Sequence, residues 1–172
     1  MGTRDTGHVV VGITASLAGY QALRYAVAQA RARRVPLIAV QTFAPSGPGG
    51  GALWREAVRE AAARDVADAF NAAMGGVPAD VPVSIELSAS GPGPGLVEIA
   101  NQPDDLLVIG GCDAPRIGRW RRAAVAGYCA RHAICPVVIT PPPSMARNES
   151  QHRLARSAAD EAERLLQAAG DA

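Results

Sequence analysis

The residues best suited to ligand chemistry directly follow apolar runs that are typical of strands. Thr14-Ala15-Ser16 follows the first run, Thr42 lies near the end of the second, and Gly110-Gly111 closes the fourth. In an open, doubly wound parallel sheet, ligands bind beyond the carboxyl ends of the strands, where the strand order reverses. Glycine amides there can approach an anion closely. We therefore expect a ligand site at these positions, centred on the loop after Gly110.

Four arginines follow this loop, namely Arg116, Arg119, Arg121 and Arg122. They lie just before or within the first turn of a predicted helix, where cations oppose the helix dipole. An anion bound at the loop would relieve that repulsion, which suggests a site for a phosphate or carboxylate ligand. In the alternative, the long side chains extend into solvent or pair with Asp113 and other surface acids. The sequence leaves both interpretations open.

Other motifs give little support for catalysis or metal binding. Gly91-Pro-Gly-Pro-Gly95 does not match G-x-G-x-x-G, and its prolines lack the N–H groups that a phosphate cradle needs, so we expect a rigid turn. Asp104-Asp105 precede a strand at the end opposite the crevice, where capping or solvation would explain them. The scattered His8, His132 and His152 argue against a structural metal. The chain has no G-x-S-x-G elbow and no Walker loop.

Composition limits the class of protein further. The chain has 172 residues and is 48% hydrophobic, which suits one globular domain with one core. A net charge of +1, from 17 basic and 16 acidic residues, argues against a nucleic-acid partner. All basic residues are arginines, which suggests a GC-rich bacterial genome. Three cysteines without C-x-x-C spacing, and no charged-then-apolar leader, predict a cytoplasmic protein. No apolar run approaches the ~20 residues of a membrane span.

The order of the elements predicts an α/β fold. The apolar spacing predicts four helices. The first follows Ser16, a good N-cap, and the second spans Trp54 to Ala73. The third opens at Gly91, and the fourth runs from Trp120 to His132. These helices alternate with near-continuous apolar runs, which are typical of a parallel sheet covered by helices on both faces. The predicted strands run from His8 to Ile13, Pro36 to Phe43, Val81 to Ser88, Leu106 to Gly110 and Pro136 to Thr140.

The C-terminal region lies outside this pattern. Pro141-Pro-Pro143 stops the fifth strand, so we place the α/β domain at residues 1–143 and a helical extension at residues 144–172. A helix predicted from about Ser150 could dock on its own domain, dock on a partner subunit, or fray. Its single apolar stripe comprises Leu154, Ala158, Ala162, Leu165 and Leu166.

Three segments resemble one known family. The first strand with its loop, Val-Val-Val-Gly-Ile-Thr-Ala-Ser, is similar to the opening V-G-V-D-G-S of the universal stress protein family. Leu106-Leu-Val-Ile-Gly-Gly111 resembles its fourth strand and glycine turn, and Ala130-Arg-His-Ala-Ile-Cys-Pro-Val-Val138 resembles its closing A-R-H-A-P-C-P-V-V. The resemblance implies a five-stranded parallel sheet of order 3-2-1-4-5, Rossmann-like, often dimerised through the last strand.

Nucleotide-binding members of that family carry G-x2-G-x9-G-(S/T). Here the first glycine of this motif corresponds to Gly110, but the other three positions differ, and so do two positions after the first strand. Asp113, which stands at the second glycine position, would bring a carboxylate toward a polyphosphate. The resemblance therefore implies a degenerate site that does not bind ATP in the usual way. The replaced positions are Thr14, Ala15, Asp113, Ala123 and Ala124.

The sequence therefore predicts a non-catalytic stress-response or regulatory protein, without a cofactor or metal, that forms a homodimer through the strand from Pro136 to Thr140. One alternative is a protein that binds ATP, AMP or a cyclic nucleotide through altered contacts. A second is a small enzyme on the same scaffold, although Thr14-Ala15-Ser16 departs from the S-G-G-x-D-S-type loop that related enzymes need. The candidate ligand-binding residues are Thr14, Ala15, Ser16, Thr42, Gly110, Gly111, Asp113, Arg116, Ala123 and Ala124.

Overall fold

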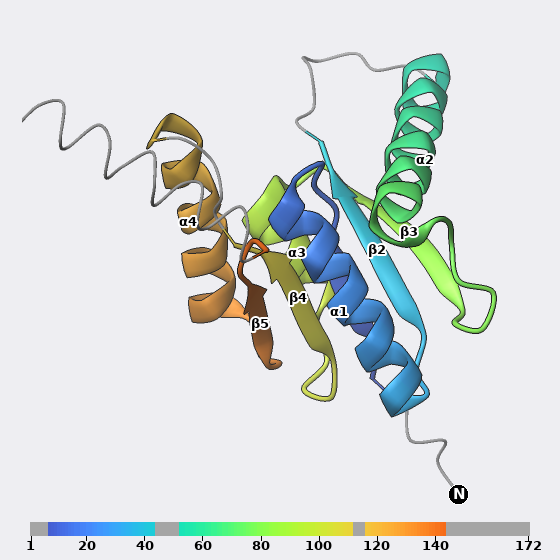
Figure 1. Cartoon of the computed structure of the whole chain (residues 1–172). Helices are drawn as coiled ribbons and strands as arrows, with labels where there is room; N and C mark the ends of the chain where they lie inside the picture. Colours follow the sequence, from blue (N-terminus) through green and yellow to red (C-terminus); the bar gives the residue numbers. More distant parts are fainter. Residues whose placement is uncertain (1–6, 44–51, 112–115, 144–172) are drawn as a thin grey trace, which may run out of the picture. The chain divides into compact units, whose positions relative to one another are not determined.

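The protein is built around one parallel sheet of five strands in the order β3-β2-β1-β4-β5 (Figure 1). The computed structural model describes residues 7–43, 52–111 and 116–143. All four neighbouring strand pairs are parallel, so the predicted fold class and strand order are confirmed. The strands are β1 (Val9–Gly12), β2 (Leu37–Thr42), β3 (Val83–Ser88), β4 (Leu106–Gly110) and β5 (Val137–Thr140).

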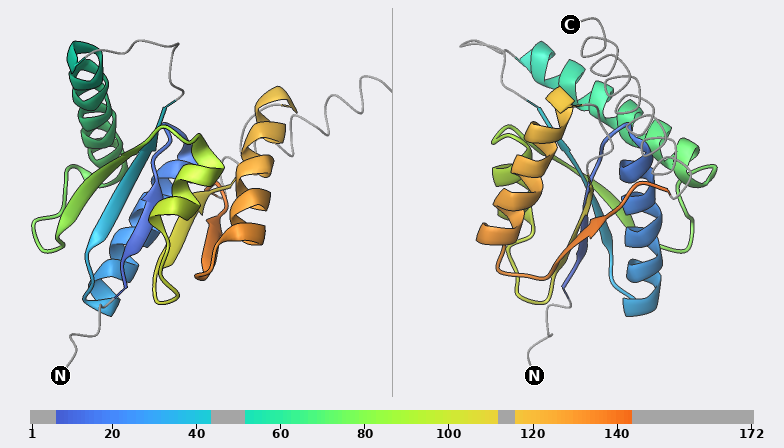
Figure 2. Two further views of the ribbon diagram at one scale, coloured as in Figure 1. Left: turned by 180° about the vertical axis from the view of Figure 1, so that it is seen from behind. Right: turned by 60° about the vertical axis from the view of Figure 1, so that its left-hand side comes forward.

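Helices cover both faces of the sheet, as Figure 2 shows from two sides. One face carries α1 (Leu17–Arg33) and α2 (Ala52–Met74), and the other carries α3 (Pro92–Ile99) and α4 (Arg116–His132). Each pair encloses its own apolar cluster: Val27 and Phe70 pack on one face, and Leu96 and Cys129 on the other. Every element belongs to the unit Met1–Pro142. The helix predicted from about Ser150 lies outside the described residues.

The central strand β1 connects the two clusters. Val9 and Val11 face the α1–α2 cluster, whereas Val10 faces the α3–α4 cluster, and all three are fully buried. A strand buried on both faces must be apolar at every position, and this is why Val-Val-Val reads as one apolar run. The edge strand β3 differs from the expected pattern, because Ser84, Ile85 and Glu86 are all exposed.

The helix ends agree with the sequence signals at α1 and differ at α4. Ser16 caps α1, since its Oγ accepts a hydrogen bond from the Gly19 N–H at 3.0 Å. Arg34 closes the same helix in the left-handed conformation. The prediction that the fourth helix starts at Trp120 is wrong, because α4 begins at Arg116. Periodicity misses this extra turn because it is rich in arginine and has few apolar residues to mark a face.

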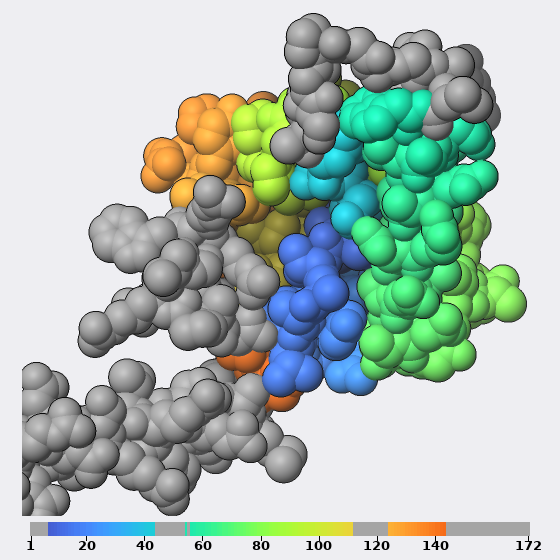
Figure 3. Space-filling view, turned by 90° about the horizontal axis from the view of Figure 1, so that it is seen from above, coloured from blue at the N-terminus to red at the C-terminus, as the bar shows by residue number. Residues whose placement is uncertain are grey.

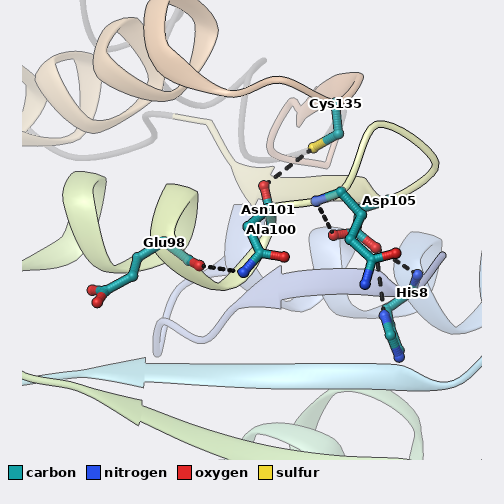
Figure 4. Close-up of polar contacts among 7 residues, drawn as sticks. His8, Glu98, Ala100, Asn101, Asp105 and Cys135 are labelled. Atoms are coloured by element: carbon teal, nitrogen blue, oxygen red, sulfur yellow. Dashed lines mark hydrogen bonds and ion pairs between the residues drawn. The ribbon is translucent and has the colours of Figure 1, made fainter. Parts of the chain in front are cut away.

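A buried carboxylate ties the first strand to the loop before β4 (Figure 4). Asp105 is only 1% exposed, and its two oxygens accept hydrogen bonds from the N–H groups of His8 at 2.7 Å and Gln102 at 3.0 Å. The His8 ring Nδ1 lies 3.5 Å from the same carboxylate. The expectation of capping or solvation therefore suits the exposed Asp104 but is wrong for Asp105, which joins two loops that are 97 residues apart.

We predict that Asp105→Ala lowers the free energy of unfolding by about 3 kcal/mol, because two charge-assisted hydrogen bonds to a buried side chain disappear and two partly buried N–H groups lose their acceptor. Asp105→Asn keeps the shape and one good acceptor, so its loss is expected to be about half as large. Urea denaturation measures both. Asp104→Ala is the matched control and is expected to change stability by less than about 0.5 kcal/mol. Equal losses at the two positions would contradict this role of Asp105.

Candidate functional site

The strand pairings separate at the carboxyl end of the sheet and open a crevice there. The pairing of β1 with β4 extends only to Val11 and Val108. In contrast, β1 stays paired with β2 as far as Gly12 and Val40, and β4 stays paired with β5 as far as Gly110 and Thr140. This is the point where the strand order reverses, and ligands of doubly wound folds bind at such points. Figure 3 shows this end of the molecule from above, with α1, the end of β2, α3 and α4 around it.

A cavity of about 230 Å³ occupies the crevice, and its walls are mainly apolar. The side chains of Thr14 and Thr42 supply the polar groups of the described lining. Known small-molecule pockets are about 300–1,000 Å³, so this cavity suits a small, flat, largely uncharged group. The lining residues are Gly12, Ile13, Thr14, Val40, Thr42, Pro92, Leu96, Ile109, Gly110 and Val125.

Three of the candidate residues named from the sequence meet at this cavity. Thr14 comes from the loop after β1, Thr42 from the end of β2, and Gly110 from the end of β4. Gly110 also lets β4 end against the first turn of α1, since a Cβ there would lie 2.7 Å from the backbone nitrogen of Gly19. A larger residue would push α1 away from the crevice.

Four other candidates lie outside the cavity lining. Ser16 uses its hydroxyl to cap α1, and Ala15 beside it is exposed. Gly111 donates its N–H to the Thr140 carbonyl at 2.7 Å, and Ala124 is exposed on α4. These positions therefore stabilise the surrounding elements or face away from the cavity in this structure.

The side chains of the other three candidate residues, Asp113, Arg116 and Ala123, lie outside what the structure describes. Asp113 is outside the described residues, and Arg116 and Ala123 are placed only as part of the backbone of α4. Arg116 opens that helix, and Arg119 also lies in its first turn. Position alone thus puts two arginines of the cluster at the amino end of α4, which follows the loop after Gly110.

The sequence did not identify the apolar residues that form the walls of the crevice cavity. Val40, Ile109 and Leu96 read as ordinary core residues, because a strand or helix residue that lines a cavity has the same apolar pattern as one that packs. Pro92 could have been found, since Gly91-Pro-Gly-Pro-Gly95 was noted as a rigid turn. The structure makes this motif the N-cap and first turn of α3, with Pro92 against the cavity.

The third helix is held closely against its neighbours by small residues and buried thiols. A Cβ at Gly93 would lie 3.0 Å from the Tyr128 ring, so α3 and α4 approach closely at that point. The thiols of Cys129 and Cys135 contact the carbonyls of Gly93 and Ala100, each at 3.9 Å. Burial raises the pKa of both thiols. They therefore stay protonated at neutral pH and act as packing groups for this cavity wall.

The described lining offers binding groups and no catalytic pair. The hydroxyls of Thr14 and Thr42 can donate or accept hydrogen bonds, but no described lining residue is an acid, a histidine or a cysteine. In the described part of the chain, no group of three His, Cys, Asp or Glu side chains could hold a metal ion. None of the described helices is long and apolar enough to cross a membrane.

The amino ends of α1 and α3, which are described, have few amides free to hold a phosphate. In α1, the Gly19 N–H is already bound to the Ser16 hydroxyl, so an anion would have to displace this cap. In α3, Pro92 and Pro94 remove N–H groups from the first turn. A phosphate group bound at a helix terminus relies on such free amides. The amino ends of α1 and α3 therefore supply few free amides to a bound phosphate.

A sheet of order 3-2-1-4-5 with a crevice at its switch point defines a doubly wound, Rossmann-like α/β domain. A sequence profile described as the universal stress protein family matches residues 6–141. The chain belongs to the universal stress protein family. No curated protein matches the chain in sequence.

Solved structures of universal stress proteins share this fold. One in complex with cAMP is 22% identical, with a TM-score of 0.55 over 80% of this chain and 98% of that chain. One from Archaeoglobus fulgidus in complex with dAMP is 21% identical, with a TM-score of 0.53 over 78% and 97%. UspA from Lactobacillus plantarum is 22% identical, with a TM-score of 0.55 over 80% and 99%. Identities this low establish the fold alone.

We predict that Cys129 and Cys135 do not react with an aromatic disulfide reagent in the folded protein at pH 8. Burial raises the pKa of each thiol, so the reactive thiolate is scarce. The folded protein holds these two thiol protons more tightly than the unfolded chain does. The resulting contribution to the free energy of unfolding is complete below the unfolded thiol pKa of about 8.5 and is lost as the pH rises above it. A Cys112→Ser variant isolates the two thiols, and the same variant in denaturant gives the full count. Stoichiometric labelling of the folded variant would contradict the prediction.

Proposed function

We propose that this chain is a non-catalytic stress-response or regulatory protein whose crevice binds an uncharged, nucleoside-sized group and has no phosphate grip. The observation that carries the proposal is the cavity of about 230 Å³, with its apolar walls and two threonine hydroxyls. Its walls suit a flat ring such as a nucleobase, and its hydroxyls suit hydrogen bonds to that ring or to a ribose. A change of occupancy would then be the regulatory signal.

The sequence of the phosphate-binding region supports the same proposal. Asp113, Ala123 and Ala124 stand at three of the four positions where nucleotide-binding relatives carry glycine or a hydroxyl residue. A carboxylate at one of them would repel a polyphosphate. Structural neighbours in complex with cAMP and dAMP make adenine-bearing molecules the first ligands to test.

A second candidate is an adenine-nucleotide binder that uses altered contacts. It is favoured by Arg116 and Arg119, which are residues of the first turn of α4 just beyond the Gly110 loop. In this case the arginines would replace the missing glycine cradle as phosphate ligands. The two candidates differ in one measurable property, namely how affinity changes as phosphates are added to adenosine.

An enzyme on this scaffold is the third candidate, and the described residues support it least. Ser16 uses its hydroxyl as a helix cap, and no described base lies in the cavity lining. Turnover of a phosphoester or thioester by the purified protein, abolished by Asp113→Ala, would establish catalysis and refute a purely regulatory role.

We predict that adenosine binds at least as tightly as AMP, cAMP and ATP, and that Mg²⁺ does not alter this order. Isothermal titration calorimetry across the series measures it. Leu96→Trp fills the cavity and is expected to abolish binding, whereas Leu17→Trp, on a half-exposed residue of α1, is the matched control and should leave binding unchanged. A rise in affinity of tenfold or more from adenosine to ATP would support the second candidate, and a flat response throughout would refute an adenine ligand.

We further propose that two copies associate through β5. This strand forms one edge of the sheet, and Ile139 on it is 47% exposed, beside the half-buried Val137 and Val138. An uncovered apolar edge strand is an aggregation hazard that pairing with a second chain removes. An arrangement of two sheets joined edge to edge would leave both crevices accessible.

We predict that Ile139→Glu converts a dimer into a monomer, because it places a charge in the middle of the proposed interface. Light scattering coupled to gel filtration reports the mass. Ile85→Glu is the matched control, since Ile85 has a similar exposure of 43% but lies on β3, at the other edge of the sheet. If the wild-type chain is already monomeric, or if both variants dissociate equally, association through β5 is refuted.

A further inference from the structure

A second depression lies at the opposite end of the sheet from the crevice, between the carboxyl end of α1 and the turn before β3. In Figure 1 this is the lower end of α1. Its volume is about 530 Å³, and it combines an apolar floor with charged groups at its rim. The lining residues are Ala30, Arg31, Arg34, Val35, Pro36, Asp80, Val81 and Pro82.

Two of the rim charges already form a fixed pair. The Arg31 guanidinium donates two parallel hydrogen bonds to Asp80, from Nε to Oδ2 at 2.6 Å and from Nη2 to Oδ1 at 2.8 Å. The hydrogen bonds from Arg31 hold the pKa of the Asp80 carboxyl below its ordinary value. Asp80 therefore stays ionised and paired, and the remaining N–H groups of Arg31 donate to no other described residue.

The third rim charge, Arg34, is in an unusual backbone conformation. Its φ of 59° and ψ of 43° place it in the left-handed region, and it is the one non-glycine residue with positive φ in the described part of the chain. Glycine or asparagine is the usual residue at this position of a helix end, because a side chain is strained there. The Arg34 guanidinium makes no hydrogen bond or ion pair with any described residue.

Helix electrostatics do not explain an arginine at this position. Cations suit the carboxyl end of a helix, but Arg31 and Arg33 already supply them within the last turn of α1. A glycine at position 34 would relieve the backbone strain at no cost to that arrangement. A cation that has no partner among the described residues and is held in a strained conformation at the edge of a depression points instead to a ligand.

We propose that this depression binds the carboxylate of a short apolar chain, with Arg34 as the main ligand for the head group. Arg31, Arg34 and Asp80 together give the rim a net charge of +1, which a monoanionic ligand would neutralise. The negative end of the α1 dipole disfavours a dianion about twice as strongly as a monoanion, so a carboxylate suits this rim better than a phosphate dianion. The apolar lining residues, which include the buried Val81 and the partly buried Val35 and Pro36, suit an apolar tail. This site is separate from the crevice and does not depend on the function proposed for it.

Heteronuclear NMR titration of the full chain with sodium hexanoate tests the proposal. Saturable shifts are expected in residues 30–36 and 80–82, and hexanol, which lacks the charge, should bind at least tenfold more weakly. A second probe, acetyl-Val-Leu with a free carboxyl group, distinguishes a peptide terminus from a free acid as the natural source, because the tighter of the two probes identifies it.

Arg34→Gly separates binding from stability. It removes the cation and the backbone strain together, so hexanoate affinity is expected to fall about tenfold or more while the melting temperature rises by roughly 2–4 °C. Arg33→Ala makes the same charge change at a residue outside the lining and should leave affinity within about twofold. Arg34→Asn also removes the cation, and asparagine tolerates the left-handed conformation, so this variant is expected to show the same loss of hexanoate affinity. Absence of saturable shifts, equal losses at Arg33 and Arg34, or a lower melting temperature for Arg34→Gly would overturn the proposal.

Discussion

The pairing of β1 with both of its neighbours is the constraint on which the rest of the structure depends. Val9, Val10 and Val11 are buried on both faces and fix β1 between β2 and β4 in the centre of the sheet. Because β1 leads through α1 to β2 on one side, whereas β4 leads through α4 to β5 on the other, the two halves of the sheet separate where β1 ends. The crevice is therefore a consequence of strand order, and its position does not depend on any particular ligand residue.

The first turn of α1 links this constraint to the shape of the site. The buried hydroxyl of Thr140 on β5 donates to the Ala18 carbonyl at 3.1 Å, and Gly110 on β4 lies directly against the same turn. Ser16 then caps the same turn by accepting a hydrogen bond from the Gly19 N–H. One short segment thus joins three strands beside the crevice.

Sequence reasoning predicted the architecture well because parallel α/β folds have strong local signals. The apolar β-branched runs, the Ser16 cap and the glycine after α2 each specify an element with little help from tertiary context. The site was predicted in outline only. The carboxyl ends of strands locate Thr14, Thr42 and Gly110, but the walls formed by Val40 and Leu96 look like core until the helices are placed.

Asp105 shows why some chemistry cannot be predicted from local patterns. A pair of acids before a strand looks solvated in sequence, and only the approach of His8, 97 positions away, makes one of them a buried acceptor. Arg34 is the converse case, since its cation looks like one more helix-end arginine until the backbone is known to be left-handed. In both cases the information is three-dimensional. Asp105 is a buried acid whose oxygens accept hydrogen bonds, whereas Arg34 is a strained residue whose side chain has no partner among the described residues. The two ends of the sheet consequently differ in kind, because the strand ends that diverge form an apolar crevice, whereas the strand starts are held by charges.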